Sequence, residues 1–236
     1  MSGTDSANGS GTWDRAATFL RKVQRRALRE TLVKWARSRK YRRIWIDVGA
    51  HHGEMTFPFA AADSSLLVYA FEPNLRAANE IMGRLRNFVV LPIAVAERDG
   101  SAELQLNAYE QSSSLLSPDR EGVKTWKSDA EFKVVGTVTV PTMRLDTFMN
   151  QTGIQSVDYL KVDAQGLDLE VVKSAGDRLK DVAKVVLEAT NVPYRQYEGA
   201  PDKTSIIEYM TAMGFRLAGE EIQSHGQEAN LTFVRR

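Results

Sequence analysis

The chain has 236 residues, of which 43% are hydrophobic and 26% charged, and its formal net charge is +1. These values are typical of one soluble globular domain, and no run of eighteen apolar residues occurs, so we expect no membrane span. The absence of cysteine excludes disulfides, thiolate metal sites and a cysteine nucleophile. Cytoplasmic residence is the simplest expectation for such a chain.

The amino-terminal segment differs in composition from the rest. Residues 1–12 are small and polar and lack the apolar core of a signal peptide, so we expect a disordered tail. Apolar residues recur at helical spacing over residues 13–40, which predicts an amphipathic helix. From Arg15 to Arg43 the chain carries twelve Lys or Arg and one acid, Glu30. This helix either packs on the domain or contacts an anionic surface: a membrane, a nucleic acid or an acidic glycan.

From residue 41 to residue 236, strand-like and helix-like segments alternate, which predicts βαβ units, a parallel sheet and one domain. Short apolar runs predict strands at 44–48, 66–72, 88–96, 157–164 and 183–190. Helical patterns occupy 54–62, 75–86, 167–179 and 202–213. We expect closing strands within 215–220 and 230–236, with an antiparallel edge.

The middle of the chain, residues 100–150, has a different pattern. Two segments with period-two alternation, 101–109 and 131–145, predict a small antiparallel excursion around a long polar loop. Long loops inside compact domains are usually functional or disordered. We expect the loops at 108–136 and 190–204 to form an acceptor pocket. In the second loop, Tyr194 and Tyr197 would either contact a sugar or pack on the core.

A glycine-rich turn follows the first expected strand. Asp47 is followed by Gly49 and Gly53, where a parallel sheet presents its ligand-binding edge. A dinucleotide site would have the spacing G-x-G-x-x-G, with a pyrophosphate at the helix start. Here His51 and Glu54 replace the later glycines, and the charge of Glu54 would repel a pyrophosphate. S-adenosylmethionine, which has no phosphate and carries positive charge, fits this turn better.

A second acid supports the same cofactor. Glu72 ends the second expected strand, twenty-five residues after Asp47. An acid at about this distance is placed to accept hydrogen bonds from ribose hydroxyls. The alternative is an exposed glutamate that caps the next helix.

Several segments together resemble the FkbM-type methyltransferases over about residues 43 to 235: "IDVGAHHGEMT", "VYAFEPN", "SSSLL", "RLDTF", "YLKVDAQGLDLEVVKSAG" and "VVLEAT". The resemblance implies a Rossmann-like class I methyltransferase fold, a three-layer α/β sandwich around a mostly parallel seven-stranded sheet. It also implies S-adenosylmethionine as methyl donor and O-methylation of a saccharide or natural product.

The chain departs from the family pattern at two places. The family has Asn where this chain has His51 or His52, and D-x-E-G-x-E where it reads Asp163-Ala-Gln165-Gly166-Leu-Asp168. Two alternatives therefore stay open. One is a cofactor-binding scaffold with weak catalysis, and the other is a nucleic-acid methyltransferase that uses the basic helix.

Asp163 ends the fourth strand of the expected main sheet and is the leading candidate to orient or deprotonate the acceptor. The alternative is a cap for the following helix. His51 and Glu188 are further catalytic candidates, although Glu188 would equally pair with a neighbour. Lys161 is expected to point away from Asp163 and to be structural. The residues expected to bind the cofactor are Asp47, Gly49, His51, Gly53, Glu72, Pro73, Ala94, Ser113 and Asp163.

No metal site is predicted. Asp163, Asp168 and Glu188 offer oxygen ligands of the kind magnesium prefers, but their spacing does not require an ion. The expected partner is a small-molecule or saccharide acceptor. The sequence leaves the oligomeric state open, and a homodimer is compatible with it.

Overall fold

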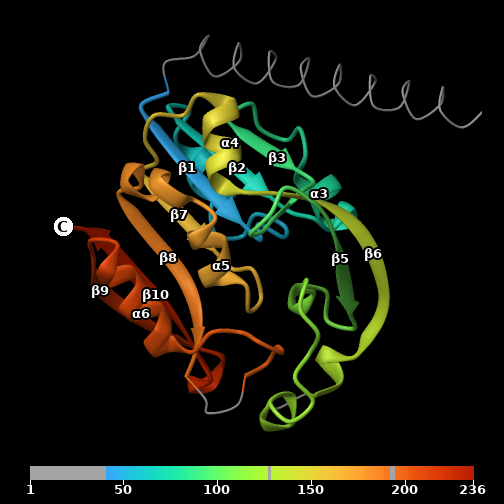
Figure 1. Ribbon diagram of the computed structural model, residues 1–236. Helices are drawn as coiled ribbons and strands as arrows, with labels where there is room; N and C mark the ends of the chain where they lie inside the picture. The colour runs from blue at the N-terminus through green and yellow to red at the C-terminus, as the bar shows by residue number, and fades with distance from the viewer. Residues whose placement is uncertain (1–40, 127–128, 192–194) are drawn as a thin grey trace, which may run out of the picture. The chain divides into compact units, whose positions relative to one another are not determined.

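The computed structural model describes residues 41–126, 129–191 and 195–236 (Figure 1). The expected tail, the basic helix at 13–40 and Tyr194 lie outside the described residues. One compact unit comprises Tyr41–Asn150 and Ile154–Arg236, and residues 151–153, at the end of helix α4 (Leu145–Thr152), are grouped apart from it. No described helix is long and apolar enough to cross a membrane.

A seven-stranded sheet in the order β3-β2-β1-β7-β8-β10-β9 forms the main unit (Figure 1). Its strands are β1 (Arg43–Val48), β2 (Leu66–Phe71), β3 (Phe88–Leu91), β7 (Tyr159–Val162), β8 (Lys184–Thr190), β9 (Phe215–Gln223) and β10 (Glu228–Arg235). The first five in spatial order run parallel, and β10 lies antiparallel between β8 and β9. These observations confirm the Rossmann-like α/β fold and the antiparallel edge.

The strand order changes direction at β1, which pairs with β2 on one side and β7 on the other. Open parallel sheets bind ligands outside the carboxyl ends of their strands at such a switch point. The ends of β1, β2 and β7 are therefore the part of the fold that positions a site.

The helices lie close to their predicted positions but are shorter. They are α2 (Phe57–Ala62), α3 (Leu75–Ile81), α5 (Asp168–Lys173) and α6 (Lys203–Ala212), with a 3₁₀ turn η4 at Gly176–Asp181. Helix α3 stops before Gly83, whose φ is +76°. Helix α4 was not predicted, although Leu145, Phe148 and Met149 have the helical spacing i, i+3 and i+4 and form its buried face.

The middle of the chain forms a second, three-stranded sheet. Strands β5 (Gly100–Asn107) and β6 (Val134–Met143) pair antiparallel, which confirms the expected excursion, and the short β4 (Ala94–Val95) pairs with β6. The prediction of one strand over 88–96 was wrong: Pro92 has no N–H for the ladder and separates β3 from β4. Three 3₁₀ turns lie between β5 and β6: η1 (Glu110–Ser112), η2 (Val123–Thr125) and η3 (Asp129–Phe132).

The core lies beneath the carboxyl ends of the strands. All six residues of β2 are buried, because the strand has a neighbour on each side, helices α2 and α3 pack on one face, and Phe148 of α4 packs on Tyr69 and Phe71 of the other. One cluster combines Leu66, Val68 and Ala70 of this strand with Ala78 and Ile81 of α3. A continuous apolar run suits such a doubly covered parallel strand. The polar site therefore begins only where the strands end.

Gly49 permits a close approach of two loops at the switch point. Its φ is +71°, and a Cβ at this position would lie 1.9 Å from the main-chain oxygen of Asp163. No side chain fits in this space, so the turn after β1 and the turn after β7 are in direct contact only because residue 49 is glycine.

We predict that Gly49→Ala destabilises the protein by about 2–5 kcal/mol, since left-handed strain adds to overpacking against backbone. Gly83→Ala is the matched control, because its φ of +76° is similar but no atom lies within 4 Å of the added Cβ. We expect this control to cost about 1–2 kcal/mol. Urea unfolding of both variants measures the difference, and equal losses would contradict the close approach.

Candidate active site

A cavity of about 710 Å³ opens at the carboxyl ends of the parallel strands. It is lined by residues at the ends of four adjacent strands: Gly49, Glu72, Asp163 and Glu188. Residues 109–115 of the β5–β6 connection cover it. We refer to it as the carboxyl-end cavity. Its volume is within the range of small-molecule and cofactor sites.

Glu72 fixes the glycine turn. One carboxylate oxygen accepts a hydrogen bond of 2.7 Å from the main-chain N–H of His51, and the other accepts one of 2.8 Å from that of Asn74. Burial raises the pKa of Glu72, and these hydrogen bonds oppose the shift. A carboxylate has about four acceptor positions, so Glu72 keeps capacity for a ligand in the cavity.

Asp47 and Lys161 form a buried ion pair below the cavity. The Asp47 side chain has no exposed surface, and its Oδ1 lies 3.2 Å from Lys161 Nζ. Lys161 Nζ also donates to the Gly49 carbonyl oxygen at 2.6 Å and lies 3.5 Å from Asp163 Oδ2. Burial would lower the pKa of Lys161, but the charges of Asp47 and Asp163 raise it overall.

The expectation that Lys161 points away from Asp163 was wrong. Residues two apart on a strand share a face, and the register places Lys161 directly opposite Asp47. Asp47 is therefore a support for the turn and does not line the cavity. Gly53 likewise lies outside the lining, and its φ of +79° shapes the turn.

Gln165 connects the acids at the far end of the cavity. Its Nε2 donates to Asp163 Oδ1 at 2.7 Å and to Glu188 Oε2 at 3.3 Å, and its Oε1 lies 2.6 Å from the Tyr197 hydroxyl. The backbone of Gln165 is left-handed, with φ of +50°. An amide can donate to two carboxylates, whereas the glutamate of the family pattern would add another negative charge.

Three further carboxyl groups near this end of the cavity have raised pKa values. Burial and the charge of Asp163 raise the pKa of Asp168 to about 7. The same causes, with Glu228, raise the pKa of Glu188. Burial also raises the pKa of Glu228, which accepts hydrogen bonds from Gln196 and Ser224. Sequence reasoning missed Glu228, because an acid within a closing strand carries no local motif.

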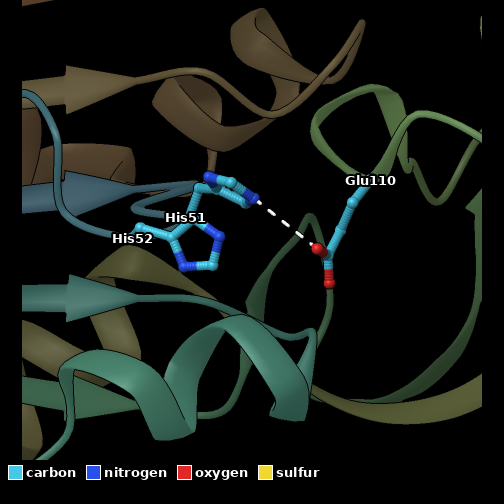
Figure 2. Close-up of side chains that lie close together, drawn as sticks. All are labelled: His51, His52 and Glu110. Carbon is cyan, nitrogen blue, oxygen red and sulfur yellow. Dashed lines mark ion pairs between the residues drawn. The ribbon is translucent and has the colours of Figure 1, made fainter.

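His51, His52 and Glu110 cluster at the other end of the cavity (Figure 2). The two imidazole rings are 3.8 Å apart, and His51 Nε2 lies 4.0 Å from Glu110 Oε2. Tetrahedral zinc would hold two such ligand atoms about 3.4 Å apart. His51 Nδ1 instead contacts Glu54 at 2.8 Å. The arrangement suits ionic contacts that connect the glycine turn to the cover.

Most residues predicted from the sequence meet at this cavity. Those that line it are Gly49, His51, Glu72, Pro73, Ala94, Ser113, Asp163 and Glu188. In the cover, Ser113 Oγ accepts from the Asn107 N–H, and the neighbouring Ser114 Oγ donates to the Gln165 carbonyl oxygen at 2.7 Å. Sequence reasoning did not identify Ser114 as the serine that connects the cover to the turn after β7.

The pKa of Asp168 predicts how stability depends on pH. The pKa of this carboxyl group is 3.8 in the unfolded chain and about 7 in the folded protein. Between pH 3.8 and pH 7, the folded state therefore holds a proton that the unfolded state has lost. Stability is then greatest near and below the lower pKa and falls as the pH rises through the higher one. The wild type should therefore lose unfolding free energy between pH 4.5 and pH 8. We predict that this loss is about 2–4 kcal/mol smaller in the Asp168→Asn variant.

Asp63→Asn is the control, because the pKa of Asp63 is lowered to about 2 by its hydrogen bond from Arg43, so Asp63 stays ionised throughout this window. Urea unfolding at both pH values tests the prediction. An unchanged pH dependence in the Asp168 variant would contradict the raised pKa.

Comparison with solved structures finds similar folds at low sequence identity. TrmK of M. capricolum in complex with S-adenosyl-homocysteine is 8% identical, with a TM-score of 0.47, and the match covers 87% of this chain and 67% of TrmK. A TehB-like SAM-dependent methyltransferase of Corynebacterium glutamicum is 7% identical, with a TM-score of 0.44, and the match covers 94% of this chain and 100% of that one.

Sequence comparison finds a relative and a family model. The 2-O-methyltransferase NoeI of Sinorhizobium fredii is 23% identical over an alignment of 178 residues, and the match covers 71% of this chain and 70% of NoeI. The model of the methyltransferase FkbM domain matches residues 47–217, which include every strand from β2 to β8 and the end of β1. The chain therefore belongs to the FkbM methyltransferase family and is an S-adenosylmethionine-dependent methyltransferase.

Proposed function

We propose that this protein methylates a hydroxyl group of a saccharide or related natural product. The observation that carries the proposal is that one cavity holds both Glu72, at the end of β2, and Asp163, at the end of β7. In this proposal, Glu72 binds the nucleoside and Asp163 takes the proton of the acceptor. The name of the relative NoeI, a 2-O-methyltransferase, supports oxygen as the acceptor atom.

The charge of the cavity fits the cofactor. Among the described residues that line it are one lysine and no arginine, and that lysine is paired with Asp47 and Asp163. Seven acids line the same cavity: Glu54, Glu72, Glu110, Glu131, Asp163, Glu188 and Glu228. Such a lining disfavours a phosphate and favours the sulfonium and ammonium groups of S-adenosylmethionine.

We assign the cofactor to the end of the cavity near β1 and β2. Gly49 lines this end, and Glu72 would accept hydrogen bonds from the ribose hydroxyls. The other residues assigned to this end are His51, Pro73, Ala94 and Ser113. When bound, S-adenosylmethionine supplies a methyl group on a positively charged sulfur, which becomes a neutral thioether as an oxygen takes the methyl group.

Asp163 is the proposed base. Its side chain is 37% exposed and lines the cavity, while Gln165 and Lys161 hold its two carboxylate oxygens in place. The acceptor oxygen gains the methyl group and gives its proton to Asp163, from which the proton passes to water. Positioning and removal of the proton are the two contributions that this chain supplies.

The other two catalytic candidates take supporting roles in this proposal. His51 contacts Glu54 and Glu110 at the cofactor end, so we assign it to holding the turn and the cover together. Glu188 lies beside Asp163 through the shared amide of Gln165, which favours a role in binding the acceptor. Contact of residues 15–43 with an anionic surface stays a prediction.

We predict that Glu72→Gln weakens S-adenosylmethionine binding about 10–100-fold, because an amide offers one acceptor oxygen in place of two and carries no charge. Titration calorimetry measures the dissociation constant. The control is Glu208→Gln, an exposed residue of α6 outside the cavity lining, which should leave that constant unchanged. Equal affinities in the Glu72 variant and the wild type would show that the nucleoside binds elsewhere.

We predict that Asp163→Asn lowers kcat about 10²–10⁴-fold while the cofactor dissociation constant changes by less than about threefold. Methyl transfer to a panel of saccharides, detected by mass, provides the readout. Asp177→Asn, exposed on η4, is the matched control. A parallel loss of cofactor binding and turnover would make Asp163 a cofactor ligand and not the base.

A further inference from the structure

Two glutamates at the acceptor end project from the same face of neighbouring strands. In the antiparallel register, Asn230 of β10 lies opposite Glu188 of β8, and Glu228 is two residues from Asn230. Directly opposite residues and residues two apart share a face, so Glu188 and Glu228 form a diagonal pair. Both side chains line the carboxyl-end cavity, and Glu228 is only 7% exposed.

The hydrogen bonds recorded for this pair come from neutral donors. Glu228 accepts from Gln196 Nε2 at 2.7 Å and from Ser224 Oγ at 2.5 Å, and Glu188 accepts from Gln165 Nε2 at 3.3 Å. Lys161, the lysine of the described cavity lining, is held by Asp47 and the Gly49 carbonyl. Glu228 is buried and Glu188 half-buried, and no ion pair of either glutamate with a cation is found among the described residues. Ionised carboxylates in such a setting are costly, so this end of the cavity is suited to a positively charged ligand.

An aromatic wall stands beside the pair. Trp126 lines the cavity, and its ring is 5.4 Å from that of Phe132 in an edge-to-face arrangement. The indole N–H of Trp126 is buried, and no hydrogen-bond partner for it is found among the described residues. Gln227 Nε2 donates to the Thr125 carbonyl oxygen at 2.8 Å, which joins the segment of Trp126 to the segment that carries Glu228.

The backbone around Glu228 is strained where it meets the cavity. Ser224 and His225 have φ of +47° and +57°, although neither is glycine, and both line the cavity. Left-handed non-glycine residues cost free energy and cluster at ligand-binding sites. The hydrogen bond from Ser224 to Glu228 connects this strained turn to the carboxylate pair.

We propose that the acceptor carries a primary ammonium group, that Glu188 and Glu228 bind this group, and that Trp126 stacks on the adjoining ring. An amino sugar is the substrate class with this chemistry. The inference rests on the proposed function, because it identifies the acceptor of the same reaction. Carboxylates bind ammonium by charge-assisted hydrogen bonds, and an aromatic face adds a cation–π contribution. The same carboxylates repel phosphorylated or carboxylated acceptors.

The test uses the full chain saturated with S-adenosylhomocysteine, so that no turnover occurs. The probes are the trisaccharide of glucosamine and its fully N-acetylated counterpart, which differ in the ammonium groups. We expect the amino form to bind at least tenfold more tightly in titration calorimetry at pH 7. Because burial raises the pKa of both glutamates, ammonium binding should also release protons, visible as a dependence of the heat on the buffer.

Variants assign the preference to named residues. Glu188→Gln and Glu228→Gln should each reduce the preference for the amino form at least fivefold and leave S-adenosylhomocysteine affinity unchanged. The control, Glu121→Gln, lies outside the cavity lining on the same β5–β6 connection and should keep the preference. Thermal unfolding of each variant confirms that it is folded.

Three outcomes would overturn the inference. The first is equal binding of the two trisaccharides by the wild type. The second is that both glutamine variants still bind the amino form more tightly. The third is that these variants lose S-adenosylhomocysteine affinity and keep the preference for the amino form. Methyl transfer to neutral saccharides, with no preference for amino sugars, would contradict this inference and leave the proposed function standing. Tighter binding of amino sugars, with no methyl transfer to any saccharide hydroxyl, would contradict the proposed function and leave the ammonium site standing.

Discussion

The buried ammonium of Lys161 is the interaction on which the rest of the site depends. It contacts Asp47 at the end of β1, the carbonyl oxygen of Gly49 in the following turn, and Asp163 at the end of β7. These groups repel one another without a cation between them. The turn after β1 and the turn after β7 can therefore lie in contact, because Gly49 removes the steric clash and Lys161 balances the negative charges. These two turns form the base of the carboxyl-end cavity.

The two ends of this cavity use their acids differently. At the end near β1 and β2, burial raises the pKa of Glu72, and the two main-chain N–H groups that donate to it oppose this shift and hold the turn. At the other end, burial and neighbouring acids raise the pKa values of Glu188 and Glu228 by more than the charge of Lys161 and the hydrogen bonds from Ser224 and Gln196 lower them. This difference supports the proposal that the nucleoside binds at the first end and the acceptor at the second.

Gln165 shows how a departure from a family pattern is consistent with function. Its amide donates to Asp163 and Glu188 and its oxygen lies beside the Tyr197 hydroxyl, so it serves as a neutral spacer among carboxyl groups. A glutamate here would add a further negative charge to an already acidic end. The amide therefore tunes the site, and this observation favours an active enzyme over a scaffold with weak catalysis.

The sequence by itself determined the sheet, most of its strands and the cofactor end, because these depend on local patterns: apolar runs, the spacing of Gly49 and the acid at residue 72. Tertiary structure alone decided the split at Pro92, the place of Lys161 and the pairing of Glu188 with Glu228. These features depend on register between strands that are distant in the chain. Side-chain spacing along one segment carries no information about which residue lies opposite on another.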